Sequence, residues 1–376
     1  MERSLSTDVL VEILRRLPPS ARRRARLVCR LWRDIVGERT TEMHSRAKPL
    51  LWNTRTAVAY VVDDVSPSST GSCRELWRTV CSNLQLVGSC NGLLCLCDNY
   101  SSGNKTGGNV TLVNPTTRET LAVPALPCAR HFVGHPWQAT RWDKAYSFGY
   151  HPTSGQYKVV HVPCSFDRVC EFDTLYVLTL RVGMEAVWRE VLLPPRGTRC
   201  NLDAGVVCVD GVTHWVTDGG AARVVSFDLD DERVTLSTTP LPALSDDYNL
   251  TVVHGRLGVV VRNPSGTRDA WVLQEGGWIR RFSVTCLWQD IPRPNFAFGD
   301  YFLKSEGSAL YGHRQKGPSS SSGCSRAGDV LKVNWSQGSG HAGCQDDGSQ
   351  HRALLLLPYV CLRLDAGAIG CFLHKV

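Results

Sequence analysis

A glycine-flanked segment has the residue types and spacing closest to a catalytic motif. Gly88-Ser-Cys-Asn-Gly92 places a thiol at the centre of a G-x-nucleophile-x-G arrangement. In hydrolases this arrangement exposes the nucleophile on a sharp turn between a strand and a helix, and a histidine activates it. His214 and His254 are the candidate bases. This hydrolase interpretation therefore requires a helix after Gly92.

The residues that follow favour a β-hairpin instead. Asn91-Gly92 is a dipeptide preferred in two-residue hairpin turns, because both positions require a positive φ. Leu93-Leu-Cys-Leu96 is a short apolar run typical of a strand. We predict that Cys90 is a structural thiol and that His214 and His254 are turn-adjacent or edge side chains.

Metal and nucleotide binding have little support. Strand alternation puts only Cys95 and Cys97 on one face, and no Cys or His pair at zinc-site spacing accompanies them. No Walker A motif occurs, and no G-x-G-x-x-G sequence follows a strand and opens a helix. We expect no metal and no cofactor.

The basic run Arg22-Arg-Arg-Ala-Arg26 supplies much of the net charge of +7. Such a run can bind nucleic acid or direct nuclear import, but no interleaved basic and aromatic residues accompany it. We interpret it as the solvated start of a helix and expect no nucleic-acid partner.

Composition and cysteine spacing predict the cellular compartment of the protein. The first residues lack the apolar run of a secretory signal, and Pro358, Arg363 and Asp365 interrupt the one apolar stretch near the C-terminus. The sixteen cysteines are scattered without a C-x-x-C pair, which favours reduced thiols over a disulfide framework. We predict a cytoplasmic and/or nuclear protein with no membrane partner.

Two short amphipathic helices are predicted within the first forty residues. Apolar residues recur at i, i+3, i+4 and i+7 in both helices, as Leu10, Ile13, Leu14 and Leu17, and as Ala25, Val28, Cys29 and Trp32. Pro18-Pro19 ends the first helix. Two helices this short bury too little surface to be stable alone. Either a partner protein or the chain's own β domain must cover them.

This segment resembles the F-box. The acidic and aliphatic first helix, the Leu-Pro break and the run Val28-Cys-Arg-Leu-Trp-Arg33 carry the resemblance. The family has Leu-Pro where this chain has Leu5-Ser6, so Ser6 or Thr7 is expected to cap the helix instead. The resemblance implies docking on a Skp-family adaptor. By position, the adaptor-binding residues are Leu5, Leu10, Ile13, Leu14, Leu17, Pro18, Leu27, Val28, Cys29 and Trp32.

From about residue 50 the apolar periodicity changes to strict alternation. Runs such as Leu175-Tyr-Val-Leu-Thr-Leu180 are rich in β-branched and aromatic residues and are bounded by turns. Asp210-Gly211 and His254-Gly255 are further hairpin signals, spaced near the ~40–50-residue pitch of propeller blades. The sequence therefore predicts a mainly β fold: a small N-terminal α-helical module followed by a kelch-like, propeller-like stack of antiparallel sheets.

A second resemblance covers this β region. Gly88-Ser-Cys-Asn-Gly-Leu-Leu-Cys-Leu96, Val113-Asn-Pro-Thr-Thr-Arg-Glu119 and Phe148-Gly-Tyr-His-Pro-Thr-Ser-Gly-Gln-Tyr-Lys-Val-Val160 follow in the order found in the F-box-associated domain of plant F-box proteins. We predict an F-box module at 1–45, the β domain at 46–316, a low-complexity flexible insertion at 317–350 and candidate closing strands at 351–376.

Together the two resemblances imply a non-catalytic substrate receptor of an SCF-type cullin–RING ubiquitin ligase. The F-box would dock on the Skp-family adaptor, and the β domain would recruit an unidentified target protein. The alternative is a stand-alone β-propeller hydrolase or carbohydrate-binding module, in which the N-terminal helices are only a lid. A pocket that unites Cys90 with His and Asp side chains would favour that alternative.

Overall fold

The computed structural model describes much of the chain between Ser6 and Leu355. The described residues are 6–17, 25, 28–29, 31–32, 35, 50–53, 56–62, 73–81, 84–99, 107–127, 142–151, 154–163, 170–180, 185–193, 198–217, 222–242, 247–253, 255–264, 266–274, 277–285, 296–298, 301–306, 309–314, 330–334 and 354–355. Leu5, Pro18, Leu27 and His254, named above, lie outside them. So does the predicted insertion, apart from 330–334.

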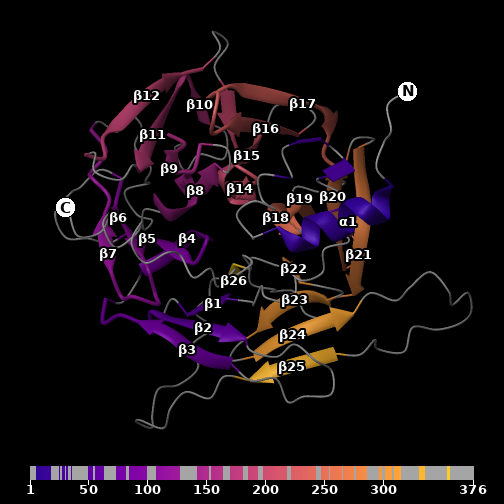
Figure 1. The fold of residues 1–376 in the computed structure, drawn as a ribbon. Coiled ribbons are helices and arrows are strands. Elements are labelled where there is room, and N and C mark those ends of the chain that lie inside the picture. The colour runs from indigo at the N-terminus through magenta and orange to yellow at the C-terminus, as the bar shows by residue number, and fades with distance from the viewer. Residues whose placement is uncertain are drawn as a thin grey trace, which may run out of the picture.

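Within the described residues, small antiparallel sheets are arranged in a ring behind one N-terminal helix (Figure 1). The first four sheets each have four strands. They comprise β26 (Leu354–Leu355), β1 (Leu50–Asn53), β2 (Val58–Val62) and β3 (Cys73–Arg78); β4 (Leu84–Cys90), β5 (Leu93–Asp98), β6 (Asn109–Val113) and β7 (Thr120–Ala122); β8 (Tyr146–His151), β9 (Gln156–His161), β11 (Thr174–Leu180) and β12 (Trp188–Leu192); and β14 (Val207–Val209), β15 (Val212–Thr217), β16 (Arg223–Asp228) and β17 (Val234–Pro240).

The rest of the ring is one eight-stranded sheet made of two four-stranded meanders. These are β18 (Tyr248–Val253), β19 (Arg256–Arg262), β20 (Thr267–Gln274) and β21 (Gly277–Thr285), then β22 (Phe296–Phe298), β23 (Tyr301–Glu306), β24 (Ala309–Arg314) and β25 (Val330–Asn334). The meanders meet where β18 and β22 pair in parallel at Val253 and Ala297. A two-stranded ribbon, β10 (Cys170–Phe172) and β13 (Thr198–Cys200), lies outside these sheets.

Local sequence explains the tight hairpins of the ring. Asn91 and Gly92 have φ values of 52° and 85°, and Asp210 and Gly211 have 51° and 79°. Positive φ at both central positions matches the twist of the flanking strands. The prediction of a mainly β, propeller-like fold with a small N-terminal helical module is confirmed. β26 pairs with β1, so the last described strand joins the first sheet of the ring.

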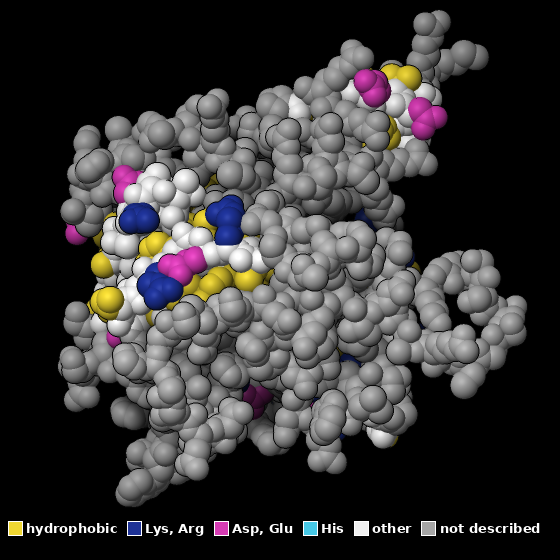
Figure 2. Space-filling model, turned by 90° about the horizontal axis from the view of Figure 1, so that it is seen from below, with side chains coloured by type: hydrophobic (Ala, Val, Ile, Leu, Met, Phe, Trp, Pro, Cys, Tyr) yellow, Lys and Arg dark blue, Asp and Glu magenta, His cyan; other side chains and the backbone are white. Residues whose placement is uncertain are grey.

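The outer strand of the first sheet is charged. β3 carries three charged residues beside its apolar ones: Arg74, Glu75 and Arg78. Figure 2 shows charged side chains over this part of the underside. Arg78 pairs with Glu75 at 2.5 Å. A charged edge discourages pairing with a strand from another chain.

Apolar cores fill the interfaces between neighbouring sheets. One cluster joins the second and third sheets through residues such as Leu112 and Leu178. Another joins the third and fourth through Val160, Trp215 and Phe227. Inter-sheet packing of this kind makes the folding of the ring cooperative, because no four-stranded sheet buries its apolar faces by itself.

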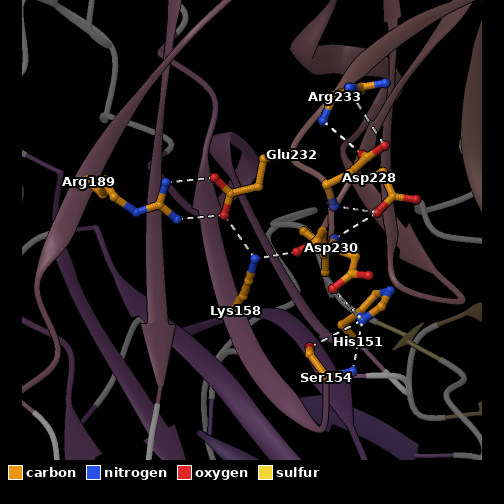
Figure 3. A network of polar contacts seen from close by, with 10 residues as sticks. His151, Ser154, Lys158, Arg189, Asp228, Asp230, Glu232 and Arg233 are labelled. Atoms are coloured by element: carbon orange, nitrogen blue, oxygen red, sulfur yellow. Dashed lines mark hydrogen bonds and ion pairs between the residues drawn. The ribbon is translucent and has the colours of Figure 1, made fainter.

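A polar network also ties the third sheet to the fourth (Figure 3). Lys158 on β9 donates from Nζ to the Leu229 carbonyl and, at 2.9 Å, to Glu232 Oε1. Arg189 on β12 donates from both terminal nitrogens to the same carboxylate at 2.6 Å. The hydrogen bonds from Arg189, together with Lys158, lower the pKa of Glu232 to about 2 against the cost of burial. Glu232 stays ionised and bridges the two sheets.

His161 is a buried imidazole in the core between the second and third sheets. Its ring lies edge-on to Tyr146, with the centroids 4.7 Å apart, and neither ring nitrogen has a hydrogen-bond partner within the described residues. Burial lowers the pKa of His161 to about 3. The folded protein therefore holds this ring neutral, whereas the unfolded chain protonates it below pH ~6.5.

We predict an acid-dependent loss of stability that originates at this ring. Between pH 7.5 and 5 the unfolded state gains a proton at His161 that the folded state does not, which costs about 2 kcal/mol. Between the same two pH values, the free energy of unfolding of His161→Phe should fall by about 2 kcal/mol less than that of the wild type. Urea unfolding of both proteins at the two pH values measures the difference. Equal losses in the two proteins would show that His161 is not the source.

Candidate functional site

The N-terminal helix α1 spans Thr7–Arg16 and begins at a serine cap. Ser6 has extended backbone angles, and its Oγ accepts a hydrogen bond of 3.4 Å from the Val9 amide. This satisfies one of the amides that a helix start leaves without a partner. Ser6 thus takes the capping role expected from the departure at Leu5-Ser6. The Leu17 amide bonds to the Leu14 carbonyl at 3.3 Å, where the helix ends.

Part of the predicted adaptor-binding set forms the interior of the helical module. Leu10 and Leu14 are buried and pack in one cluster with Ala25 and Ile35. Among the residues that the structure describes, the cluster consists of N-terminal residues and no strand residue contributes to it. In this structure Leu10 and Leu14 therefore pack the first helix against the segment that contains Ala25 and Ile35.

Other members of the set face outward. Ile13 is 40% exposed, Val28 is 63% exposed, and Cys29 is also exposed. Leu17 and Trp32 are half-buried and pack against the module's interior. Figure 2 shows hydrophobic and acidic side chains together on the described N-terminal helix, at the upper right of that view. Large exposed apolar side chains gathered on a small module are characteristic of a protein-binding surface.

Two exposed apolar residues were not in the predicted set. Val9 is 46% exposed and Leu31 is 48% exposed. Val9 lies four residues before Ile13 on α1, so these two share a helical face. Val28 lies in a turn and Cys29 is not helical, so the predicted second helix is not continuous between Ala25 and Leu31. We call Val9, Ile13, Val28 and Leu31 the exposed apolar stripe. The predicted set thus contains both inward-facing residues, such as Leu10 and Leu14, and outward-facing ones, such as Ile13 and Val28.

The candidate nucleophile Cys90 does not lie on a hydrolase turn. It ends β4, and the Asn91-Gly92 turn leads directly into β5, which is a hairpin and not a strand–turn–helix. His214 Nδ1 is 2.9 Å from Ser226 Oγ, and burial lowers the pKa of His214 to about 4. A histidine with so low a pKa is a weak general base at neutral pH.

The cysteines of this region are core thiols. Cys95 and Cys97 are fully buried, and burial raises the pKa of Cys95. Within the described residues, no group of three or more His, Cys, Asp or Glu side chains is placed to hold a metal ion. In the same part of the chain, α1 is too short to cross a bilayer, and no other helix is long and apolar enough.

Two known families match the chain, one over the helical module and one over the ring. Residues 58–297 match the family described as the F-box associated beta propeller domain, which is more than half of the chain. The chain belongs to this family. Residues 3–40 match the F-box domain. The predicted identity as a plant-type F-box protein with an F-box-associated domain is confirmed.

Similar F-box proteins occur in Arabidopsis thaliana. One putative F-box protein is 27% identical over 314 residues, which cover 74% of this chain and 76% of the relative. Another F-box protein is 25% identical over 336 residues, covering 77% and 76%. The pairing of F-box and F-box-associated domains supports, in general terms, a substrate-receptor role in an SCF-type ligase.

Among solved structures, a putative 6-phosphogluconolactonase from Bacteroides uniformis aligns with a TM-score of 0.41 and 12% identity. The alignment covers 77% of this F-box protein and 97% of that chain. A likeness this low carries no argument about chemistry.

Proposed function

We propose that this F-box protein is the substrate receptor of an SCF-type cullin–RING ubiquitin ligase in the cytoplasm and/or nucleus. The exposed apolar stripe docks on a Skp-family adaptor, and the propeller binds a target protein. The observation that supports this most directly is that the four side chains of the stripe lie within the F-box match and are 40–63% exposed. An apolar surface left open in this way needs a protein partner.

The mechanism is tethering, without bond-making by this chain. The adaptor fixes the receptor to the ligase scaffold, and the propeller holds the target near the enzyme that carries ubiquitin. Holding two reactants on one assembly raises their effective concentration and makes the transfer step effectively intramolecular. The receptor's residues therefore act by binding and orientation.

Affinity capture tests this proposal. Full-length protein should capture the adaptor and a cullin, and a version that lacks residues 1–45 should capture neither. A target that binds the propeller should be captured by both versions. Circular dichroism of the shortened protein checks that the ring remains β-structured. Equal recovery of the adaptor by both versions would contradict the docking assignment.

A further inference from the structure

Lysine is scarce in this chain, whereas arginine is abundant. The sequence contains 8 lysines and 34 arginines, although lysine is ordinarily among the commonest residues of soluble proteins. Residues 1–47 contain eleven arginines and no lysine, and residues 159–303 contain thirteen arginines and no lysine. The chain therefore carries most of its positive charge on guanidinium groups.

The ion pairs of the structure show the same preference at the surface. Arginines whose side chains are 40–82% exposed pair with carboxylates at Arg78, Arg189, Arg233, Arg262 and Arg280. The lysines whose side chains the structure describes, Lys144 and Lys158, are more sheltered than any of these arginines. The Lys144 side chain is 24% exposed and that of Lys158 is 6% exposed. The exposed cations of these pairs are thus guanidinium groups.

Folding does not require arginine at such positions. Arg233 Nε lies 3.9 Å from Asp231 Oδ2, and Arg280 Nη1 lies 3.4 Å from Asp269 Oδ2. Both distances exceed the about 2.7–2.9 Å of the short, forked contacts that favour a guanidinium over an ammonium. An exposed cation in a pair of this kind contributes about 0–1 kcal/mol. The difference between arginine and lysine that matters there is chemical reactivity.

Ubiquitin transfer needs a free amine. A lysine Nζ attacks the thioester carbonyl that joins ubiquitin to its carrier enzyme, the C–N bond of an isopeptide forms, and the C–S bond breaks. The carrier thiol leaves with the proton that the amine loses. A guanidinium stays protonated and is not an acceptor, whereas lysine is the usual one. A receptor held on the ligase presents its own amines at the same raised effective concentration as those of its target.

We propose that the use of arginine in place of lysine protects the ring from ubiquitination by the ligase that it serves. This proposal rests on the proposed ligase function. Lys144 donates to Asp203 at 2.6 Å, and Lys158 donates to Glu232 and to the Leu229 carbonyl (Figure 3). These contacts hold both amines away from an incoming thioester. Ubiquitin therefore passes to the bound target and not to these parts of the receptor.

Self-modification in a reconstituted ligase tests the proposal. The full chain is assembled with adaptor, cullin and RING protein and incubated with ubiquitin and its activating and conjugating enzymes. Modified lysines are mapped by mass spectrometry. We expect no ubiquitin on Lys144 or Lys158 of the wild type.

A charge-conserving variant supplies the missing acceptors. Arg233→Lys with Arg280→Lys keeps both positive charges and adds two exposed amines. Both introduced lysines should carry ubiquitin, and the receptor should be modified at least about threefold faster than the wild type. The matched control, Arg233→Gln with Arg280→Gln, removes the same guanidinium groups without adding amines. It should be modified at the wild-type rate.

Two further readouts separate this proposal from the ligase function. Transfer of ubiquitin to free lysine in solution shows whether each assembly is active, and a wild type that binds no adaptor and supports no such transfer would refute the ligase function itself. Acetylation of the folded protein alone, with a succinimidyl ester, needs no ligase. It should modify the introduced lysines faster than Lys144 and leave Lys158 unmodified.

Two results would overturn the protection proposal. One is ubiquitin on Lys144 or Lys158 of the wild type in an active assembly. The other is an active assembly of the folded double lysine variant in which the introduced lysines stay unmodified.

Discussion

Replacing Ile13 and Val28 with aspartate is expected to weaken binding to a purified Skp-family adaptor by at least about 100-fold. Both side chains are exposed, so the substitutions leave the interior around Leu10 and Leu14 intact. On docking, each aspartate would be buried without a partner. Hot-spot residues near the centre of an interface contribute above ~2 kcal/mol, and 100-fold corresponds to about 2.8 kcal/mol. Titration calorimetry with the adaptor measures the change.

Two control variants separate docking from folding. Leu14→Ala removes a fully buried side chain and should destabilise the helical module by about 2–5 kcal/mol, so it should weaken binding together with helix content. Val80→Asp adds a charge at a fully exposed apolar residue of the ring and should change neither property. Wild-type affinity in the Ile13→Asp, Val28→Asp double variant would exclude the exposed apolar stripe as the docking surface.

Lys158→Met is expected to lower the free energy of unfolding by about 3 kcal/mol. The Lys158 side chain is only 6% exposed, and its ammonium satisfies both the Leu229 carbonyl and Glu232. The methionine leaves these acceptors buried with one donor fewer. Breaking a buried pair on one side typically costs about 3–5 kcal/mol. Arg189 still holds Glu232, which places the expected value at the lower end of that range.

Arg189→Met is the matched control at the same carboxylate. The Arg189 side chain is 54% exposed, and exposed ion pairs contribute about 0–1 kcal/mol. Its loss should therefore cost no more than about 1 kcal/mol. Urea unfolding at neutral pH measures both variants. A Lys158→Met protein as stable as Arg189→Met would show that burial does not set the strength of this network.

Local patterns predicted the elements of this fold well. The Asn91-Gly92 and Asp210-Gly211 turns were predictable because positive φ at two successive positions restricts the residue types. The first helix was predictable because its apolar spacing and Ser6 cap are both local features.

The division of the helical module into interior and surface was not predictable from one helix alone. Leu14 and Ile13 are neighbours in a single apolar stretch, yet Leu14 is fully buried and Ile13 is 40% exposed. The difference depends on where Ala25 and Ile35 pack, which the periodicity of the first helix does not specify.

Contacts between distant segments could not be predicted from the sequence either. Lys158 and Glu232 are 74 residues apart, and nothing local in either segment indicates the other. The pairing of β10 with β13 likewise joins the backbones of two separate connections. Register at such a place is set by tertiary packing, so it becomes visible only in the structure.

Titration of purified full-length protein with a purified Skp-family adaptor measures whether the N-terminal apolar surface binds that adaptor. We expect a saturable 1:1 complex with a negative heat-capacity change, the signature of buried apolar surface. Absence of binding by the folded, unaltered protein would contradict it.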